Sequence, residues 1–102
     1  MADPLPLLPT EYELHSNFPN PFNPTTEIHF DLPEGGNVSL VVYDVLGREV
    51  ANLVSGYREA GYHRLTWSAS GQASGVYFAR FSVTNAQGNV AYTKVNKLML
   101  VR

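Results

Sequence analysis

The segment TEIHFDLPEGGNVSLVVYDVLG, residues 26–47, carries the clearest structural pattern in the chain. Apolar residues alternate with polar ones in both of its halves: Ile28, Phe30, Leu32, Val38, Leu40 and Val42. This two-residue period is typical of β-strands that bury one face. Residues 33–36 (PEGG) fit a turn between the halves, and Asp44 with Gly47 fits a type I turn that leads into a bulge. The segment therefore predicts two β-strands, each followed by a tight turn.

The same kind of pattern continues along the rest of the chain. Residues 75–83 (GVYFARFSV) and 90–101 are rich in aromatic and β-branched residues, whereas residues 68–74 are small and polar and fit a loop. We expect strands near residues 11–16, 26–32, 37–43, 48–54, 62–68, 75–83 and 90–101. Residues 45–54 compete as a helix, but their β-branched residues and internal glycine argue against it. About seven short strands separated by turns predict an all-β fold, an antiparallel β-sandwich of two sheets.

Proline divides the 102-residue chain into two parts. All seven prolines lie at or before Pro33. Residues 1–13, which hold the first three of them, are typical of a stiff, extended linker, and residues 14–102 form the predicted sandwich domain. The start MADPLPLLPT has no charged and apolar leader pattern, so an exported protein would carry its leader elsewhere.

The proline-rich stretch FPNPFNP, residues 18–24, lies at the entrance to the predicted domain. Its three prolines lack the N–H groups that the interior of a sheet requires. Flexible linkers do not usually carry phenylalanine, so we expect Phe18 and Phe22 to pack over one end of the sandwich. We expect Asn20 and Asn23 to hydrogen-bond to nearby backbone and to hold the turn before the next strand. The alternative is a proline-rich ligand for a partner, which would need both phenylalanines exposed.

Composition and spacing argue against several classes of function. The formal net charge of −2 gives no reason to expect nucleic acid or an anionic membrane as a partner, and no apolar run reaches the roughly 20 residues that cross a bilayer. The chain has no cysteine, and its three histidines do not fall at metal-ligand spacing. Neither a catalytic serine elbow nor a phosphate-binding glycine motif occurs. We therefore predict no enzyme activity, no cofactor and no metal, with calcium at the turn of Asp44 as an alternative.

The aromatic residues fall into two groups. Trp67 shares a strand face with Leu65, which favours a place in the centre of the core over a sugar-binding platform. Tyr57 and Tyr62 flank a glycine-containing loop and are the better candidates for exposed rings. Exposed tyrosines leave a carbohydrate-binding module of a secreted enzyme as an alternative function.

Four blocks of the sequence together resemble the C-terminal sorting domain of proteins that Gram-negative bacteria export through the type IX secretion system. The blocks are FPNPFNPTT (residues 18–26) with the strand that follows, VSLVVYDVLGREV (38–50), GYHRLTW (61–67) with ASGVYF (73–78), and the ending TKVNKLMLVR (93–102). They occur in the order and at the spacing of the family, from about residue 14 to the last residue. The resemblance implies an immunoglobulin-like β-sandwich that is not an enzyme.

The resemblance also implies an export address and a set of partners. Family members are fused to the C-terminal end of cargo proteins, and a leader first takes these proteins to the periplasm. The type IX translocon and its shuttle proteins then recognise the folded domain, and the cargo reaches the cell surface or the extracellular space. A sortase-like peptidase usually cuts just upstream of the domain, and the cargo is released or joined to lipopolysaccharide. In this chain the cut would fall in or before residues 1–15.

The residues that carry the resemblance form two sets. The family motif places mainly structural residues at Pro19, Asn20, Pro21, Gly47, Gly75 and Tyr77, the glycines for backbone geometry and the tyrosine for packing. The candidates for translocon recognition lie in the last strand: Lys94, Lys97, Leu98, Met99, Leu100, Val101 and Arg102. The basic residues there either guard an edge strand or belong to a peptide edge that pairs with the translocon by strand addition. Arg102 stands where the family more often ends in lysine.

A third class of function stays open beside sorting and carbohydrate binding. The immunoglobulin-like domains of flagellar hook-capping proteins have similar Pro-Asn-Pro and Asp-x-x-Gly-Arg blocks. Such a domain would assemble with hook subunits. The basic ending at residues 97–102 favours the sorting function over both alternatives.

Overall fold

The computed structural model describes residues 7–102, so Pro4 and Pro6 of the expected linker lie outside the described residues. Seven β-strands follow one another: β1 (Glu13–Leu14), β2 (Thr25–Leu32), β3 (Gly36–Tyr43), β4 (Glu49–Arg58), β5 (Gly61–Ser68), β6 (Gly75–Thr84) and β7 (Val90–Leu100). Residues 7–102 contain no helix, and therefore no helix long and apolar enough to cross a membrane. The predicted all-β fold is confirmed.

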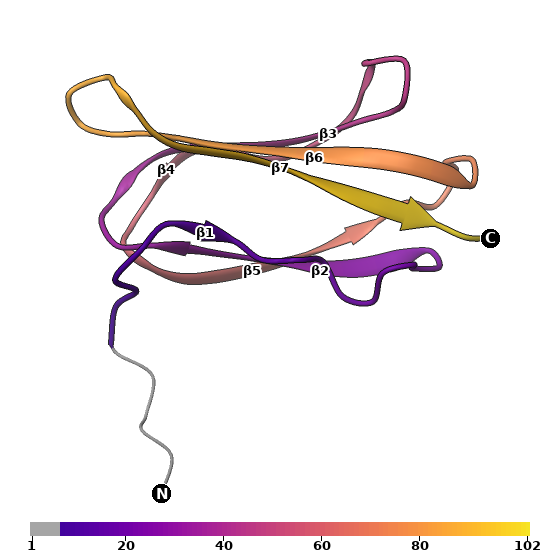
Figure 1. Cartoon of the computed structure of the whole chain (residues 1–102), viewed down its shortest axis with the longest axis horizontal. Coiled ribbons are helices and arrows are strands. Elements are labelled where there is room, and N and C mark those ends of the chain that lie inside the picture. The colour runs from indigo at the N-terminus through magenta and orange to yellow at the C-terminus, as the bar shows by residue number, and fades with distance from the viewer. Residues whose placement is uncertain (1–6) are drawn as a thin grey trace, which may run out of the picture.

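The strands form two antiparallel sheets that face each other (Figure 1). The three-stranded sheet has the order β1-β2-β5, and the four-stranded sheet has the order β4-β3-β6-β7. In the strand letters of immunoglobulin domains these orders are A-B-E and C′-C-F-G. The fold is therefore an immunoglobulin-like sandwich of seven strands.

The core lies between the sheets and follows from the alternation of side chains along each strand. In β2, Ile28, Phe30 and Leu32 are buried, whereas Glu27 and His29 are exposed. The facing sheet contributes the inward residues of β3, β6 and β7, which are Val38, Leu40, Val42, Tyr77, Ala79, Phe81, Val83, Leu98 and Leu100. Each sheet is thus apolar on one face, and the two apolar faces cover each other.

Trp67 lies in this core, as its strand pattern predicts. Its side chain is 6% exposed, and its ring contacts Phe22 and Tyr77, with ring centroids 5.6 and 5.9 Å apart. The ring is therefore a packing residue and is not available as a sugar-binding platform.

Two hairpins are closed by the same kind of turn. Asp44 Oδ1 accepts hydrogen bonds from the N–H groups of Leu46 (2.9 Å) and Arg48 (3.0 Å). Asn85 Oδ1 accepts in the same way from the N–H groups two and four residues further on. Gly47 ends the first turn with φ +81°, a left-handed conformation that glycine adopts at the lowest cost.

The strand boundaries depart from the predicted ones at two places. The first strand is only Glu13–Leu14. The N–H of His15 still bonds to the carbonyl of His29, but the chain then leaves β2 and pairs with it again only at Phe18. The fourth strand runs to Arg58, where residue 54 was expected. Its last residues pair in unbroken register with residues 36–40 of β3, and the two register shifts of this pair lie nearer its other end.

Residues 18–24, called the collar from here on, connect the two sheets. Phe18 pairs with Glu27 at the edge of the three-stranded sheet. Phe22 then pairs in parallel with Leu100 at the edge of the four-stranded sheet. The collar therefore crosses from one sheet to the other along one open side of the sandwich.

Only one collar phenylalanine enters the core. Phe22 is 1% exposed, but Phe18 is 79% exposed, so the expectation that both rings pack over the sandwich is wrong for Phe18. The reason is the register. Phe18 pairs with Glu27, whose side chain lies on the solvent face of β2, and directly opposed residues of an antiparallel pair point to the same face.

Candidate functional site

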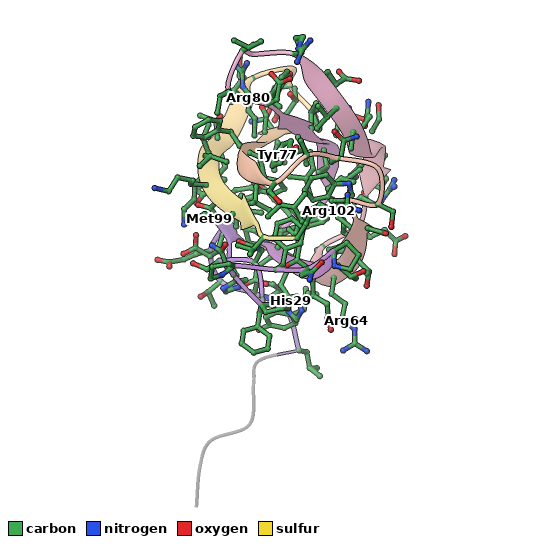
Figure 2. All side chains as sticks on the ribbon, turned by 90° about the vertical axis from the view of Figure 1, so that its right-hand side faces the viewer. His29, Arg64, Tyr77, Arg80, Met99 and Arg102 are labelled. Atoms are coloured by element: carbon green, nitrogen blue, oxygen red, sulfur yellow. The ribbon has the colours of Figure 1, made fainter. Side chains whose placement is uncertain are left out.

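The segments that carry the family resemblance meet at one end of the sandwich. This motif end consists of the collar, the turn at residues 44–48, residues 69–75 between β5 and β6, and the tail at residues 100–102. In Figure 1 these segments lie on the right with the C terminus, whereas the chain enters the fold on the left. Figure 2 looks directly onto the motif end, with Tyr77 and Arg102 near its centre.

Asn20 joins the collar to β7. Its Oδ1 accepts from the N–H of Met99 (3.0 Å), and its Nδ2 donates to the carbonyl of Lys97 (3.3 Å). The backbone of Phe22 continues the contact, since its N–H donates to the Met99 carbonyl (2.9 Å) and its carbonyl accepts from Val101 (3.0 Å). The Asn20 amide thus pairs with β7 as a further strand would.

The expected local role of Asn20 is therefore wrong, and other residues hold the collar turn. Asn17 Nδ2 donates to Thr26 Oγ1 (3.0 Å), and both side chains also donate to the carbonyl of Pro19. Asn17 and Thr26 are buried, and these bonds satisfy the Asn17 Nδ2 group and the Thr26 hydroxyl, whereas Asn17 Oδ1 has no partner among the described residues. Asn23 makes no side-chain hydrogen bond within residues 7–102. The sequence contains no periodic signal that would single out Asn17.

Tyr77 lies near the start of β6. Its ring is 5% exposed, and its hydroxyl donates to the carbonyl of Ala73 (2.6 Å). A tyrosine at the start of strand F that bonds to backbone a few residues upstream is the tyrosine corner of immunoglobulin-like domains. Gly75, with φ +151°, lies between these two residues, where another residue would be strained. The motif residues Gly75 and Tyr77 thus shape the loop that enters β6.

The tail extends over the loop between β5 and β6. The N–H of Arg102 donates to Ser74 Oγ (3.0 Å), and its Nη1 donates to the carbonyl of Gln72 (2.6 Å). The last residue is therefore held at the motif end by its backbone and by its side chain.

The candidate recognition residues of β7 lie on two faces of the strand. Leu98 and Leu100 are 1% and 2% exposed and belong to the core. Lys97 and Met99 alternate with them and lie on the outer face of the sheet. Lys94 lies an even number of positions from Leu98 and Leu100, so its side chain is on the inner face of β7 and points toward the other sheet. The seven candidates therefore do not form one surface.

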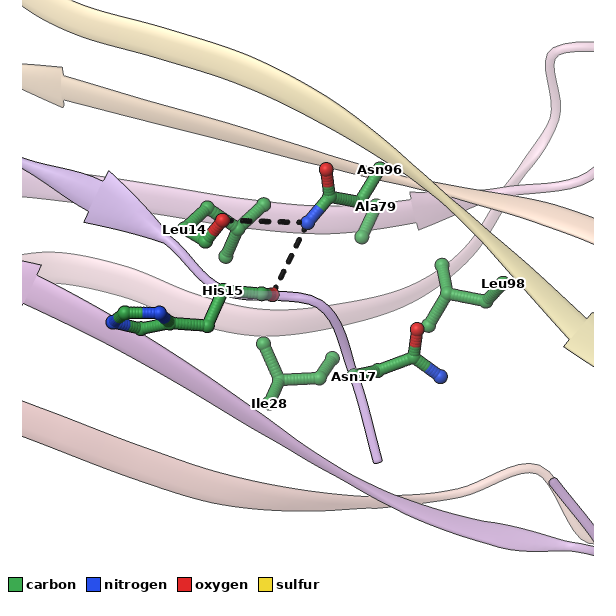
Figure 3. A pocket seen from close by; sticks show the side chains of 7 residues that line it. All are labelled: Leu14, His15, Asn17, Ile28, Ala79, Asn96 and Leu98. Atoms are coloured by element: carbon green, nitrogen blue, oxygen red, sulfur yellow. Dashed lines mark hydrogen bonds between the residues drawn. The ribbon is translucent and has the colours of Figure 1, made fainter. Parts of the chain in front are cut away.

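Two side chains of β7 fasten the strand to the segment around β1. Lys94 Nζ donates to Glu13 Oε1 (2.8 Å) and to the carbonyl of Leu14 (3.0 Å). The amide of Asn96 donates to the carbonyls of Leu14 (3.5 Å) and His15 (3.1 Å), as Figure 3 shows. These bonds hold the two sheets together at the end where the chain enters.

Glu13 and Lys94 stabilise each other's charged form. The hydrogen bond from Lys94, followed by one from the Tyr92 hydroxyl, lowers the pKa of Glu13 below its ordinary 4.5. The same contact raises the pKa of Lys94 above its ordinary 10.5. Both groups are therefore charged around neutral pH.

The outer edge of β7 is occupied near the motif end. Asn20 and Phe22 take up backbone groups of Lys97, Met99 and Val101. A partner strand that added to this stretch would have to displace the collar.

The histidines lie apart from the motif end. His15 Nε2 lies 2.8 Å from Asp31 Oδ2, and the side chains of His15 and His29 are both 48% exposed. His63 stacks on Phe30 with ring centroids 4.9 Å apart. Within residues 7–102, no group of three or more His, Asp or Glu residues is arranged to hold a metal ion.

The two candidate tyrosines are exposed, as the sequence predicts. Tyr57 is 60% exposed and Tyr62 is 44% exposed. They lie in β4 and β5, which belong to different sheets. A flat carbohydrate platform needs rings on one surface, so this placement gives the carbohydrate-binding alternative no support.

The strand order and the tyrosine corner define the class of the protein as an immunoglobulin-like β-sandwich domain. The sequence profile of the secretion system C-terminal sorting domain matches residues 16–96, and the chain belongs to this family. It therefore carries a C-terminal sorting signal of the type IX secretion system. Among curated proteins, no sequence matches the chain.

The matched range covers most of the motif end. It includes the collar, the Asp44 turn and the tyrosine corner, and it ends at Asn96 within β7. Residues 97–102 lie beyond the matched range, and their place at the motif end is defined by their contacts in the fold.

Proposed function

We propose that the domain directs an N-terminally fused cargo across the outer membrane and that the type IX translocon and its shuttle proteins recognise the motif end together with the adjoining outer face of β7. The observation that carries the proposal is the convergence of separate sequence blocks at the end of the sandwich opposite to the point where the chain enters (Figure 1). A cargo attached ahead of β1 leaves this end uncovered. The signal is then a folded surface, and its transit runs through the periplasm to the cell surface or the extracellular space.

After translocation, a sortase-like peptidase cuts upstream of β1, and the cargo is released or attached to the surface. Leu7 and Leu8 are 99% and 50% exposed, whereas Pro9 is buried and Tyr12 stacks on Tyr92 with ring centroids 5.9 Å apart. Peptidases bind exposed segments that few contacts hold. A cut before Pro9 would leave the sandwich intact, and this supports a linker that ends shortly before the sandwich.

The proposal is tested by placing the chain behind a leader and a fluorescent reporter in a host with the type IX machinery. The informative change is the double variant Lys97→Glu/Met99→Asp, because both side chains lie on the outer face and leave the core unchanged. We expect the wild-type fusion at the cell surface and the double variant in the periplasm.

A matched control carries Arg58→Glu/Val90→Asp, which makes the same kind of change at the opposite end of the sandwich. This control is expected to reach the surface. Retention of the wild-type fusion in the periplasm would refute the sorting function. Export of all three proteins would keep the function but remove the outer face of β7 from the recognition surface.

A further inference from the structure

A hollow of about 300 Å³ lies at the motif end between two family blocks. One wall is the turn after β3, with Val45 and Leu46 at its tip. The other wall is the entrance to β6, with Ala73, Val76 and Tyr77. The hollow opens to solvent at the surface that we propose as the recognition end.

The walls are more apolar than a solvated turn requires. Val45 and Leu46 are 67% and 74% exposed, although turn tips usually carry polar residues. Neither side chain stabilises the core, because both stand outside it. Exposed apolar side chains that border a concave surface are typical of a protein docking site.

The rim of the hollow carries one exposed cationic side chain, Arg48, beside one carboxylate, Asp44. Asp44 is the one carboxylate among the lining residues, and hydrogen bonds from Leu46 and Arg48 engage both of its oxygens. Asp44 holds the Nε of Arg48 at 2.8 Å, while the Arg48 side chain is 73% exposed. Its terminal nitrogens are left available for a bidentate contact with an incoming carboxylate.

We propose that this hollow takes up a loop of a partner protein that inserts an apolar side chain between Leu46 and Val76 and places a carboxylate on Arg48. The apolar walls fit the side chain, and the exposed guanidinium fits the acid. This inference rests on the proposed sorting function, because the partner is the component of the export machinery that reads the motif end.

The test uses the same reporter fusion with three variants at the hollow. Leu46→Asp places a negative charge on the apolar wall, and Ala73→Trp fills the hollow without a charge. Both positions are exposed, and the Tyr77 hydroxyl bonds to the backbone of Ala73, so the tyrosine corner stays intact. Arg48→Glu reverses the charge on the rim, and Arg48→Lys keeps it.

We expect Leu46→Asp, Ala73→Trp and Arg48→Glu to lower the reporter at the cell surface at least about tenfold, equivalent to roughly 1.4 kcal/mol of binding free energy. Arg48→Lys should retain more export than Arg48→Glu. The control Val90→Asp, at the opposite end of the sandwich, should be exported like the wild type. Thermal unfolding of each purified domain checks that the variants are folded.

The outcomes separate the two proposals. If the wild-type fusion is not exported, the sorting function itself fails. If the wild type is exported and the folded Leu46→Asp and Ala73→Trp variants are exported equally well, the docking site is refuted and the sorting function stands. A purified domain that forms dimers which Leu46→Asp dissolves would also overturn the proposal, since the occupant would then be a second copy of the chain.

Discussion

Single side chains at the motif end hold its backbone segments against one another. Asn20 bonds to β7, Arg102 bonds to the loop before β6, and the Tyr77 hydroxyl bonds to Ala73 within that loop. Each of these bonds fixes one segment against another at the surface of the sandwich. Removing one should loosen the motif end without emptying the core.

Asn20→Ala removes both hydrogen bonds between the collar side chain and β7. We expect a loss of about 1 kcal/mol in the free energy of unfolding, since the bonds are partly solvated and net contributions are about 0.5–1.5 kcal/mol each. Hydrogen exchange of the Met99 amide should become faster, because that N–H loses its acceptor. The control is Asn23→Ala, whose side chain makes no such bond within the described residues. Equal exchange at Met99 in both variants would contradict the proposed role.

Tyr77→Phe removes the hydroxyl of the tyrosine corner and keeps the buried ring. The expected cost is about 1 kcal/mol, which corresponds to roughly 4–8 °C in the melting temperature of a domain of this size. Tyr57→Phe makes the same chemical change at a ring that is 60% exposed, and it should melt like the wild type. A Tyr77→Phe domain with an unchanged melting temperature would show that the bond to Ala73 contributes nothing.

At the scale of elements, the collar and β7 depend on each other. The collar covers the outer edge of β7 and inserts Phe22 beside Trp67. In turn, β7 supplies the backbone groups that hold the collar in place. At the motif end, a segment near the start of the fold is therefore held by its last strand.

We expect truncation of the two collar phenylalanines to change the free energy of unfolding by very different amounts. Phe22→Ala should cost about 3–5 kcal/mol, because it leaves a cavity in the core. Phe18→Ala should change stability by less than about 0.5 kcal/mol, because that ring is exposed. Urea unfolding of the two variants measures the difference. Similar midpoints would contradict the register that places Phe18 outside.

Deletion of residues 98–102 is expected to unfold the domain. It removes Leu98 and Leu100 from the core and takes away the partner of the collar. Circular dichroism and amide NMR spectra of the purified deletion variant should show the loss of the β-sandwich. A folded deletion variant would contradict the structure of β7. If this deletion abolishes export, the cause is the loss of the folded domain. Substitutions of outward-facing side chains therefore test the signal better, because they leave the core unchanged.

At the scale of the whole molecule, the two sheets are joined at both ends. The collar and the tail join them at the motif end, and the contacts of Lys94 and Asn96 join them where the chain enters. Only the first of these two regions lies on the proposed recognition surface. The second holds the sandwich closed close to the attachment point of the cargo.

The ion pair between Glu13 and Lys94 gives the stability of the molecule a defined pH dependence. The lowered pKa of Glu13 contributes stability above pH 4.5, which is lost as the pH falls through the folded-state pKa. The raised pKa of Lys94 contributes stability below pH 10.5, which is lost as the pH rises through the folded-state pKa. The pair is therefore fully stabilising between those two values.

Glu13→Gln should lower the free energy of unfolding by about 0.5–1 kcal/mol at pH 7, a small amount because water screens both partly exposed side chains. Near pH 3 the difference from the wild type should shrink, since Glu13 is then increasingly protonated in the wild type. Urea midpoints at the two pH values measure this change. Glu11→Gln, at an exposed neighbouring carboxylate, serves as the control. A difference that is equal at both pH values would contradict the ion pair.

Much of the fold could be predicted from local sequence patterns. Alternating residues such as Ile28 and Phe30 identify the strands, because backbone geometry sends successive side chains to opposite faces. The turn at Asp44 was predictable for a similar reason, since its carboxylate bonds to groups no more than four residues away. These features depend on neighbours within a few residues, and so they can be inferred without knowledge of the topology.

The amino-acid sequence by itself determined the all-β class, the core face of each long strand and the membership of the sorting family. Only the tertiary structure decided that Phe18 is exposed, that Asn20 bonds to β7, and that Lys94 bonds to Glu13. Contacts of this kind join residues up to 82 positions apart. They depend on how the collar crosses between the sheets, and this crossing is fixed by sheet packing and strand register rather than by any local pattern.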